Sequence, residues 1–154
     1  MGGRIRLDIM EVRRGRHLIS TDAAKLDLTV VHTYLSETAY WAKGRSFDVV
    51  QRSIRHSLCF GVYEDAHQVG FARVVTDFAT FAWLCDVFIL GSHQGRGLGK
   101  WLLETVLAHP ELRAISRILL ATRDAHELYG RYGGFELLPN PDRWMMRTLP
   151  KSPS

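Results

Sequence analysis

The sequence predicts an α/β fold in which a mixed sheet of six to seven strands carries about four helices on both faces. Three strand-like runs follow one another at residues 58–63, 69–75 and 83–90, and the short turns between them indicate an antiparallel meander. After the meander, helical and strand-like patterns alternate, which indicates further strands in the same sheet. The 154 residues are suited to a single domain spanning residues 1–154.

The composition is that of an ordinary globular protein, with 46% apolar and 23% charged residues. The net charge of +4 comes from scattered Lys and Arg residues, and this pattern argues against a nucleic-acid-binding module. The sequence has neither a signal-peptide pattern nor an apolar run of the ~18 residues that a membrane span needs. We therefore expect a cytoplasmic protein without membrane contact, in which Cys59 and Cys85 stay reduced.

The N-terminal region predicts a strand pair followed by a helix. Residues 5–9 alternate apolar and polar side chains, which indicates a strand extension within residues 1–16. Residues 12–19 are the predicted antiparallel partner of this strand. Thr21 or Asp22 can cap a first helix, because both residue types are good N-caps, and apolar residues follow at helical spacing from about residue 28 onward.

The remaining elements follow from apolar spacing and from residues that begin or end helices. A second helix is predicted at residues 47–56, with Ser46 as its N-cap. Its inward-facing residues are predicted to be Val49, Val50 and Ile54. Beyond the meander, the predicted elements are a helix at 98–107, a strand at 115–121, a helix at 125–132 capped by Asp124, strands at 135–138 and 144–148, and a flexible tail at 150–154.

A glycine-rich turn follows the third strand of the meander. Gly95, Gly97 and Gly99 lie between this strand and the next helix, whose first N–H groups and positive dipole end face the same turn. Three glycines leave room for an anion to approach the backbone amides, so the sequence predicts an anion cradle, most simply for phosphate. The spacing fits neither a P-loop nor the dinucleotide fingerprint.

The pattern Gln-x-x-Gly-x-Gly, at Gln94, Gly97 and Gly99, resembles the pyrophosphate loop of the GNAT superfamily of acyl-CoA-dependent N-acetyltransferases. A second segment, residues 120–129 followed by Gly134-Phe135, also resembles this family, and the order of elements agrees from about residue 17 onward. The chain departs from the family in having Thr122 where Asn is common and in placing the Gly-Phe pair one residue later. The resemblance implies acetyl transfer from acetyl-CoA to a primary amine in a ternary complex.

The resemblance also implies how acetyl-CoA, the co-substrate, is held. Backbone amides of the glycine loop are expected to bind the pyrophosphate, with Arg96 and Lys100 adding positive charge. The preceding strand is expected to pair with the pantetheine arm, provided that neighbouring strands splay apart there. The expected cofactor-binding residues are Val87, Phe88, Ile89, Gln94, Gly95, Arg96, Gly97, Leu98, Gly99, Lys100, Thr122, Asp124 and Ala125.

Two residues are the main candidates for catalysis. Tyr129 stands where the family has a helix tyrosine, and a phenol can protonate a departing thiolate. Asp86 is the single ionisable residue in an apolar strand, so it either accepts the amine proton through water or is a satisfied structural or substrate-binding carboxylate. His93 and His126 flank the site in sequence and are alternative bases. No pair of His and Cys residues has metal-ligand spacing, so we expect no metal.

The acceptor is not identified by the sequence. The resemblance implies that Tyr40 and Trp41, between the first two helices, shape the acceptor pocket, and Arg45, Phe78 and Trp83 are further candidates. Polyamines, aminoglycosides, amino acids and protein or peptide amines all remain open, and so does a second copy of the chain as partner. An alternative to the enzyme is a domain of the same fold that binds acyl-CoA as a sensor without turnover.

Overall fold

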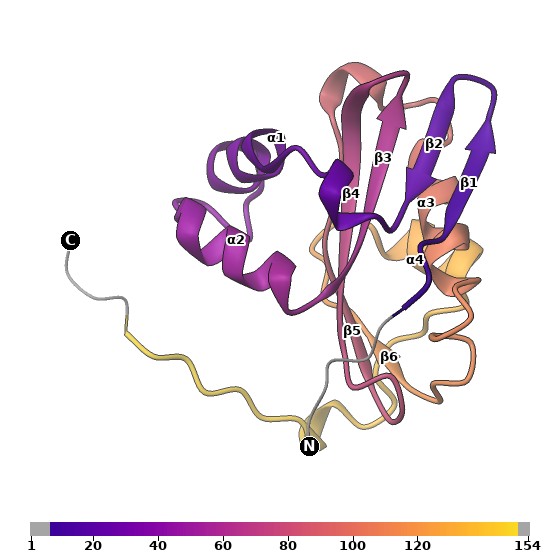
Figure 1. The fold of residues 1–154 in the computed structure, drawn as a ribbon. Coiled ribbons are helices and arrows are strands. Elements are labelled where there is room, and N and C mark those ends of the chain that lie inside the picture. Colours follow the sequence, from indigo (N-terminus) through magenta and orange to yellow (C-terminus); the bar gives the residue numbers. More distant parts are fainter. Residues whose placement is uncertain (1–6, 151–154) are drawn as a thin grey trace, which may run out of the picture.

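The computed structural model describes residues 7–150, and its centre is one six-stranded sheet (Figure 1). The strands are β1 (Glu11–Arg14), β2 (His17–Ser20), β3 (Leu58–Glu64), β4 (His67–Thr76), β5 (Ala82–Ile89) and β6 (Ile118–Leu119). They pair in sequence order, antiparallel from β1 to β5, whereas β6 is parallel to β5. The mixed sheet and the meander of β3, β4 and β5 confirm the prediction.

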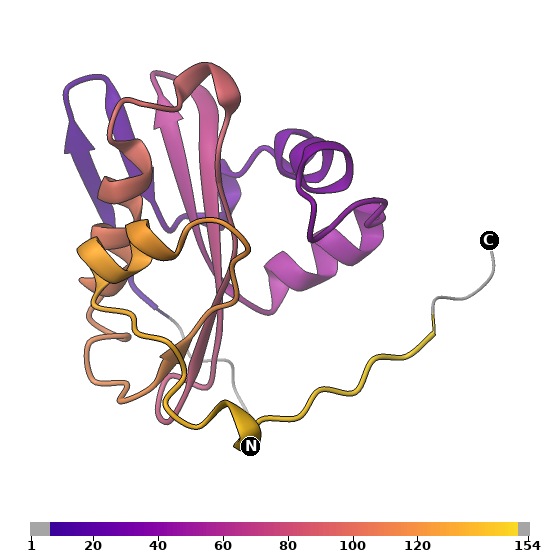
Figure 2. The same ribbon diagram turned by 180° about the vertical axis from the view of Figure 1, so that it is seen from behind.

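Four α-helices cover the two faces of the sheet, as predicted (Figures 1 and 2). They are α1 (Leu28–Thr33), α2 (Phe47–Arg55), α3 (Leu98–Leu107) and α4 (His126–Gly133). The first two lie on one face and the last two on the other. Shorter turns are the π-helix Tyr34–Thr38 and the 3-10 helices Ala23–Lys25, Gly91–His93 and Pro141–Arg143. Within residues 7–150, every helix is too short or too polar to cross a bilayer.

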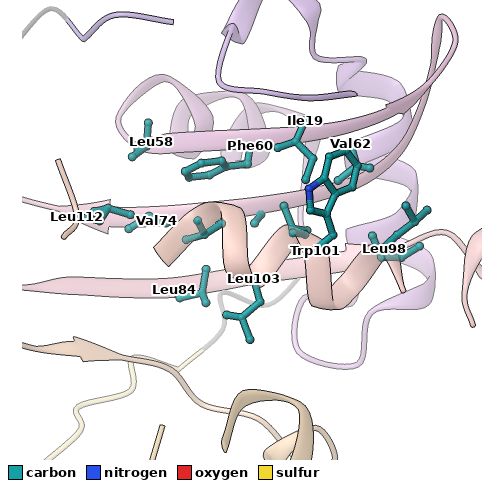
Figure 3. Close-up of a cluster of buried hydrophobic side chains, with 14 of the residues drawn as sticks. Ile19, Leu58, Phe60, Val62, Val74, Leu84, Leu98, Trp101, Leu103 and Leu112 are labelled. Carbon is teal, nitrogen blue, oxygen red and sulfur yellow. The ribbon is translucent and has the colours of Figure 1, made fainter. Parts of the chain in front are cut away.

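Each face of the sheet has its own apolar core, because successive strand residues point to opposite sides. On the side of α3, Trp101 and Leu103 belong to one cluster with Phe60 and Val62 of β3 and Leu84 of β5 (Figure 3). On the side of α1 and α2, the buried side chains are Val31, Leu35, Val50, Ile54, Cys59, Phe71 and Phe88. Because side chains on both faces of β3 to β5 are buried, these strands form a rigid support for the residues at their ends.

The N-terminal strands differ from the prediction. β1 starts at Glu11 and β2 at His17, so the predicted strand at residues 12–19 is interrupted by the two-residue turn of Gly15 and Arg16. Residues 7–10 are not in a strand, and the rest of the predicted strand at residues 5–9 lies outside the described residues. The hairpin forms within residues 11–20 instead, because the tight turn determines which residues pair.

The early helices are confirmed with shifted ends. Asp22 caps only the short 3-10 turn, and α1 begins after Asp27, whose carboxylate accepts hydrogen bonds from the N–H groups of the first turn. Ser46 caps α2 as predicted. The predicted inward position of Val49 is wrong, because this side chain is 54% exposed while its neighbour Val50 is buried.

The strands predicted after α3 are shorter or missing. The strand predicted at residues 115–121 is reduced to β6, and residues 135–138 and 144–148 form no strand. The side chains of this last segment lack a packing surface, since Leu137 is 81% and Met146 89% exposed. Apolar alternation therefore predicted a strand for which the described chain provides no partner.

Candidate active site

A β-bulge lies in the middle of β5. Phe71 of β4 is opposite Phe88, but Arg73 is opposite Cys85, so β5 has one more residue than β4 over this stretch. Asp86 lies within the bulge and has a φ of 53°, in the left-handed region that non-glycine residues rarely adopt. A backbone in this conformation must be held by its surroundings.

The edge of β5 beyond the bulge is open. On that side β6 pairs only with the first two residues of β5, through Ala82 with Ile118 and Trp83 with Leu119. From residue 84 to 89, β5 has no strand partner on this side among residues 7–150. The two parallel strands therefore diverge toward the end of β5, where the glycine loop begins. This is the splay that strand addition by an extended ligand requires.

The carboxylate of Asp86 is buried and has three donors from two distant parts of the chain. Trp41 Nε1 donates to Oδ1 at 2.9 Å, Arg45 Nη1 donates to Oδ2 at 2.9 Å, and Arg73 Nε donates to Oδ2 at 2.8 Å. These contacts satisfy the charge of a side chain that is only 2% exposed. Of the two roles open for Asp86, the geometry favours the structural or substrate-binding carboxylate.

A cavity of about 280 Å³ lies where β5 and β6 diverge. Its lining residues are Tyr40, Trp41, Arg45, Arg73, Trp83, Leu84, Cys85, Asp86, Val87, Leu120, Ala121, Thr122, Asp124, Ala125 and Tyr129. They come from the loop between α1 and α2, from β4 and β5, from the segment between β6 and α4, and, for Tyr129, from α4 itself. Most catalytic and acceptor candidates from the sequence therefore line one cavity.

Tyr129 is a mostly buried phenol in the wall of this cavity. Burial, with smaller contributions from Tyr40 and Asp124, raises the pKa of Tyr129 to about 12. Its hydroxyl makes no hydrogen bond within the described part of the chain. The side chain therefore stays protonated at neutral pH and presents a donor without an internal acceptor, as a general acid must.

The loop between α1 and α2 forms the cavity mouth. The Tyr40 hydroxyl accepts a hydrogen bond from the backbone N–H of Arg123 at 2.8 Å, and the Arg123 guanidinium lies 3.8 Å from the centre of the Tyr40 ring. Tyr40 and Trp41 pack edge to face. These contacts join the loop to the segment before α4, so the two sides of the mouth are held together.

Three of the candidate residues from the sequence do not line this cavity. Phe78 is in the turn between β4 and β5, with a φ of 61°, and does not line the cavity. His126 opens α4 but is not among the lining residues. His93 is in the turn after β5, where its Nε2 lies 2.9 Å from Glu64 Oε2. Neither histidine reaches the cavity.

The glycine loop leads directly into α3. Gly95 and Gly97 have φ values of 80° and 79°, and a Cβ built on either would meet no atom within 4 Å. The glycines therefore set the backbone conformation and leave open space beside it. Gly97 is the N-cap of the ten-residue helix α3 and makes no side-chain hydrogen bond to it. The cap therefore leaves the N–H groups of the first turn available to a ligand. This arrangement suits an anion such as a pyrophosphate.

Side chains around the loop fix its position. Gln94 Nε2 donates to the carbonyl of Ile89 at 2.9 Å, which ties the loop to the end of β5. Arg96 Nη1 lies 3.6 Å from Glu64 Oε2, and Lys100 Nζ lies 4.5 Å from the Tyr132 ring centre. Thr122 Oγ1 accepts from the N–H of Ala125 at 3.0 Å just before α4. It supports this turn in place of the predicted Asp124 cap, because the helix starts at His126.

Arg73 and Cys85 also line the cavity and were not among the candidates predicted from the sequence. Arg73 carried the same signal as Asp86, since it is the one charged residue in the apolar stretch 69–75. Arg73 and Asp86 have opposite charges and are each alone in an apolar strand, which indicated that the two neighbouring strands bring them together. Among the described residues no cluster of three or more metal-ligand side chains is present.

The chain resembles known proteins over most of its length. It matches the acetyltransferase (GNAT) family over residues 28–135. A candidate acetyltransferase from Gibberella zeae is 35% identical over 146 residues, which cover 80% of this chain and 81% of the relative.

Solved structures agree with this similarity. A crystal structure of a candidate GNAT-family acetyltransferase from Xanthomonas campestris is 49% identical, with a TM-score of 0.84 over 87% of this chain and 94% of that one. A Staphylococcus aureus structure, at 20% identity, has a TM-score of 0.68 over 86% of this chain and 98% of that one, which shows a shared fold.

Proposed function

The chain belongs to the GNAT family of acetyltransferases, and we propose that it transfers the acetyl group of acetyl-CoA directly to the primary amine of an acceptor. The observation that carries the proposal is the splay between β5 and β6. It opens between a cavity that holds Tyr129 and a glycine loop at the start of α3, so one extended ligand can reach both.

The residues present fit acetyl-CoA as the co-substrate. The N–H groups of residues 95–100 would hold its pyrophosphate, because the left-handed glycines keep the space beside them open. The unpaired edge of β5, at Val87, Phe88 and Ile89, would bind the pantetheine arm as an added strand. Thr122, Asp124 and Ala125 form the opposite side of the splay.

The chemistry needs one bond to form and one to break. The neutral amine of the acceptor attacks the thioester carbonyl carbon, the C–N bond forms, and the C–S bond breaks. The sulfur leaves with a proton from Tyr129, whose raised pKa keeps the phenol protonated beforehand. The proton that the amine loses returns to the phenolate through water, so protons balance over the cycle. Acetyl-CoA supplies the acetyl group and the thiol that leaves.

Asp86 acts in this proposal by positioning. Its three hydrogen bonds hold Trp41, Arg45 and Arg73 around the cavity. Because both carboxylate oxygens already accept hydrogen bonds from these side chains, the proton from the amine goes to water near the cavity mouth. The alternative, a non-catalytic acyl-CoA sensor, has no use for a protonated phenol in the acceptor cavity.

One experiment separates the enzyme from the sensor. Acetyl-CoA binding is measured by calorimetry, and thiol release is measured with a broad amine panel, for the wild type and Tyr129→Phe. We expect the variant to bind acetyl-CoA with unchanged affinity while kcat falls by about 100-fold, the usual contribution of a general acid. Binding without acetylation of any amine by the wild type would support the sensor instead.

A further inference from the structure

The inner wall of the acetyl-acceptor cavity has more positive than negative charge. Four charged residues line the cavity. Asp124 is at the mouth, where its side chain is 67% exposed and lies 3.8 Å from Arg123. The inner three are Arg45, Arg73 and Asp86, with side chains 23%, 14% and 2% exposed. Two guanidinium groups therefore share one buried carboxylate.

Arg45 and Arg73 have more N–H donors than the Asp86 carboxylate accepts. A guanidinium has five N–H donors. Within residues 7–150, the Arg45 side chain makes one hydrogen bond, from Nη1 to Asp86. Arg73 makes two, from Nε to Asp86 and from Nη1 to the Ser57 hydroxyl. Both side chains therefore reach the cavity with N–H groups left over and with one charge unmatched.

From this imbalance we infer that the acceptor is a small amine that also carries a carboxylate, which Arg45 and Arg73 bind. The inference rests on the proposed acetyl transfer. A carboxylate on the acceptor would match the extra positive charge and receive the remaining guanidinium donors. The residue pair thus determines specificity by holding the acid group, which leaves the amine of the same molecule near Val87 and Tyr129.

The same charge acts against the other acceptor classes. Polyamines and aminoglycosides carry several ammonium groups, and each would be repelled by the unmatched guanidinium in a partly buried cavity. An acceptor with one ammonium group and one carboxylate has no net charge, so the unmatched guanidinium does not repel the molecule as a whole.

A matched acceptor panel tests the inference. Each α-amino acid is compared with its C-terminal amide and with the amine that lacks the carboxylate, and spermidine and kanamycin represent polycations. Acetylation is followed as thiol release at saturating acetyl-CoA. For the best amino acid we expect kcat/KM to exceed that of its amide by about 10- to 100-fold, as for other hydrogen bonds to charged groups.

Two variants assign the effect to the arginine. Arg45→Gln should reduce the ratio of kcat/KM for the amino acid to kcat/KM for its amide toward one, mainly by raising the KM of the amino acid. Calorimetry should show an unchanged acetyl-CoA affinity. Arg45→Lys should restore part of the ratio, because it returns the charge without the planar fork. Arg52→Gln is the matched control, since Arg52 is exposed on α2 away from the cavity, and it should keep the full ratio.

The outcomes are distinct. Equal or better turnover of the amide, the decarboxylated amine or a polycation by the wild type overturns the carboxylate inference and leaves acetyl transfer intact. This comparison needs no variant, so misfolding of Arg45→Gln cannot obscure it. An acid preference that survives in folded Arg45→Gln overturns the role of Arg45. If acetyl-CoA binds and no amine is acetylated, the proposed function fails, and the inference fails with it.

Discussion

Trp41 donates its indole N–H to Asp86 Oδ1 over 2.9 Å, which joins two parts of the chain 45 residues apart. The contact fixes the loop between α1 and α2 against the bulge of β5. An aromatic side chain at the cavity mouth is therefore positioned by the same carboxylate that holds the two arginines of the wall. The position of Trp41 at the cavity mouth therefore depends on the bulge of β5.

Trp41→Ala should raise the acceptor KM while leaving acetyl-CoA binding unchanged. The substitution removes an aromatic wall that is 40% exposed at the mouth, and aromatic anchors of this kind contribute roughly 10-fold or more in affinity. Steady-state kinetics with the acceptor varied gives the first quantity, and calorimetry gives the second. Trp41→Phe keeps the ring without the N–H and should be intermediate. An unchanged acceptor KM in Trp41→Ala would refute this role.

Asp86→Asn should lower the free energy of unfolding by about 3 kcal/mol, because it leaves two mostly buried guanidinium groups without their anion. Asn tolerates the left-handed φ of this position, so the loss reports the charge and not the backbone. Urea unfolding measures it. Asp48→Asn, at an exposed position in the first turn of α2, should cost less than about 1 kcal/mol. Equal losses in the two variants would contradict the prediction.

Tyr129 should make stability fall at high pH. Its folded pKa of about 12 is above the ~10 of an exposed phenol, so the folded chain holds this proton more tightly than the unfolded chain. The free energy of unfolding is then unaffected by Tyr129 below pH ~10 and decreases as the pH rises toward 12. Urea unfolding between pH 9 and 11 should show a smaller decrease for Tyr129→Phe than for the wild type. Identical slopes would show that Tyr129 is exposed in solution.

Cys85 should react slowly with iodoacetamide although it lines the cavity. Burial raises the pKa of its thiol to about 11, so the reactive thiolate is scarce at neutral pH. We expect alkylation at pH 8 to be roughly 100-fold slower than for free cysteine and to accelerate with pH. Peptide mass spectrometry assigns the label, and Cys59, which is buried, should remain unlabelled. Rapid labelling of Cys85 at neutral pH would be inconsistent with this burial.

Gly97→Ala should cost about 1–2 kcal/mol of stability and weaken acetyl-CoA binding. A Cβ at this position meets no neighbouring atom, so the cost comes from the φ of 79° alone. Gly99→Ala is the control, because Gly99 lies inside α3 with ordinary helical geometry and should not lose stability. Urea unfolding and calorimetry with acetyl-CoA provide both measurements. A similar loss in both variants would mean that the loop conformation is not what matters.

Sequence reasoning was most successful where the signal is local. Ser46 and Gly97 each act within one or two turns of chain, and the helices that they begin are close to prediction. It failed where a partner strand was needed, as in the predicted strands at 135–138 and 144–148. Alternating apolar and polar residues show that a segment can form a strand. Whether it joins the sheet depends on a partner strand, which the sequence of the segment does not specify.

The candidate site shows the same division. Asp86 was identified as an unusual acid because one charge in an apolar strand is visible in the sequence. Its three donors were not visible, since Trp41 and Arg45 come from a loop and Arg73 from another strand. Phe78, a further acceptor candidate from the sequence, lies in the turn between β4 and β5 and does not line the cavity.

The sequence by itself determined the mixed α/β fold, the meander, the glycine loop and, through residues 94–100 and 120–129, the family of the chain. These features depend on short-range patterns that neighbouring residues carry. Only the tertiary structure decided the bulge at Asp86, the splay of β5 from β6 and the shared arginine wall. The physical reason is that a left-handed aspartate in a strand is stable only when donors from distant segments satisfy its charge.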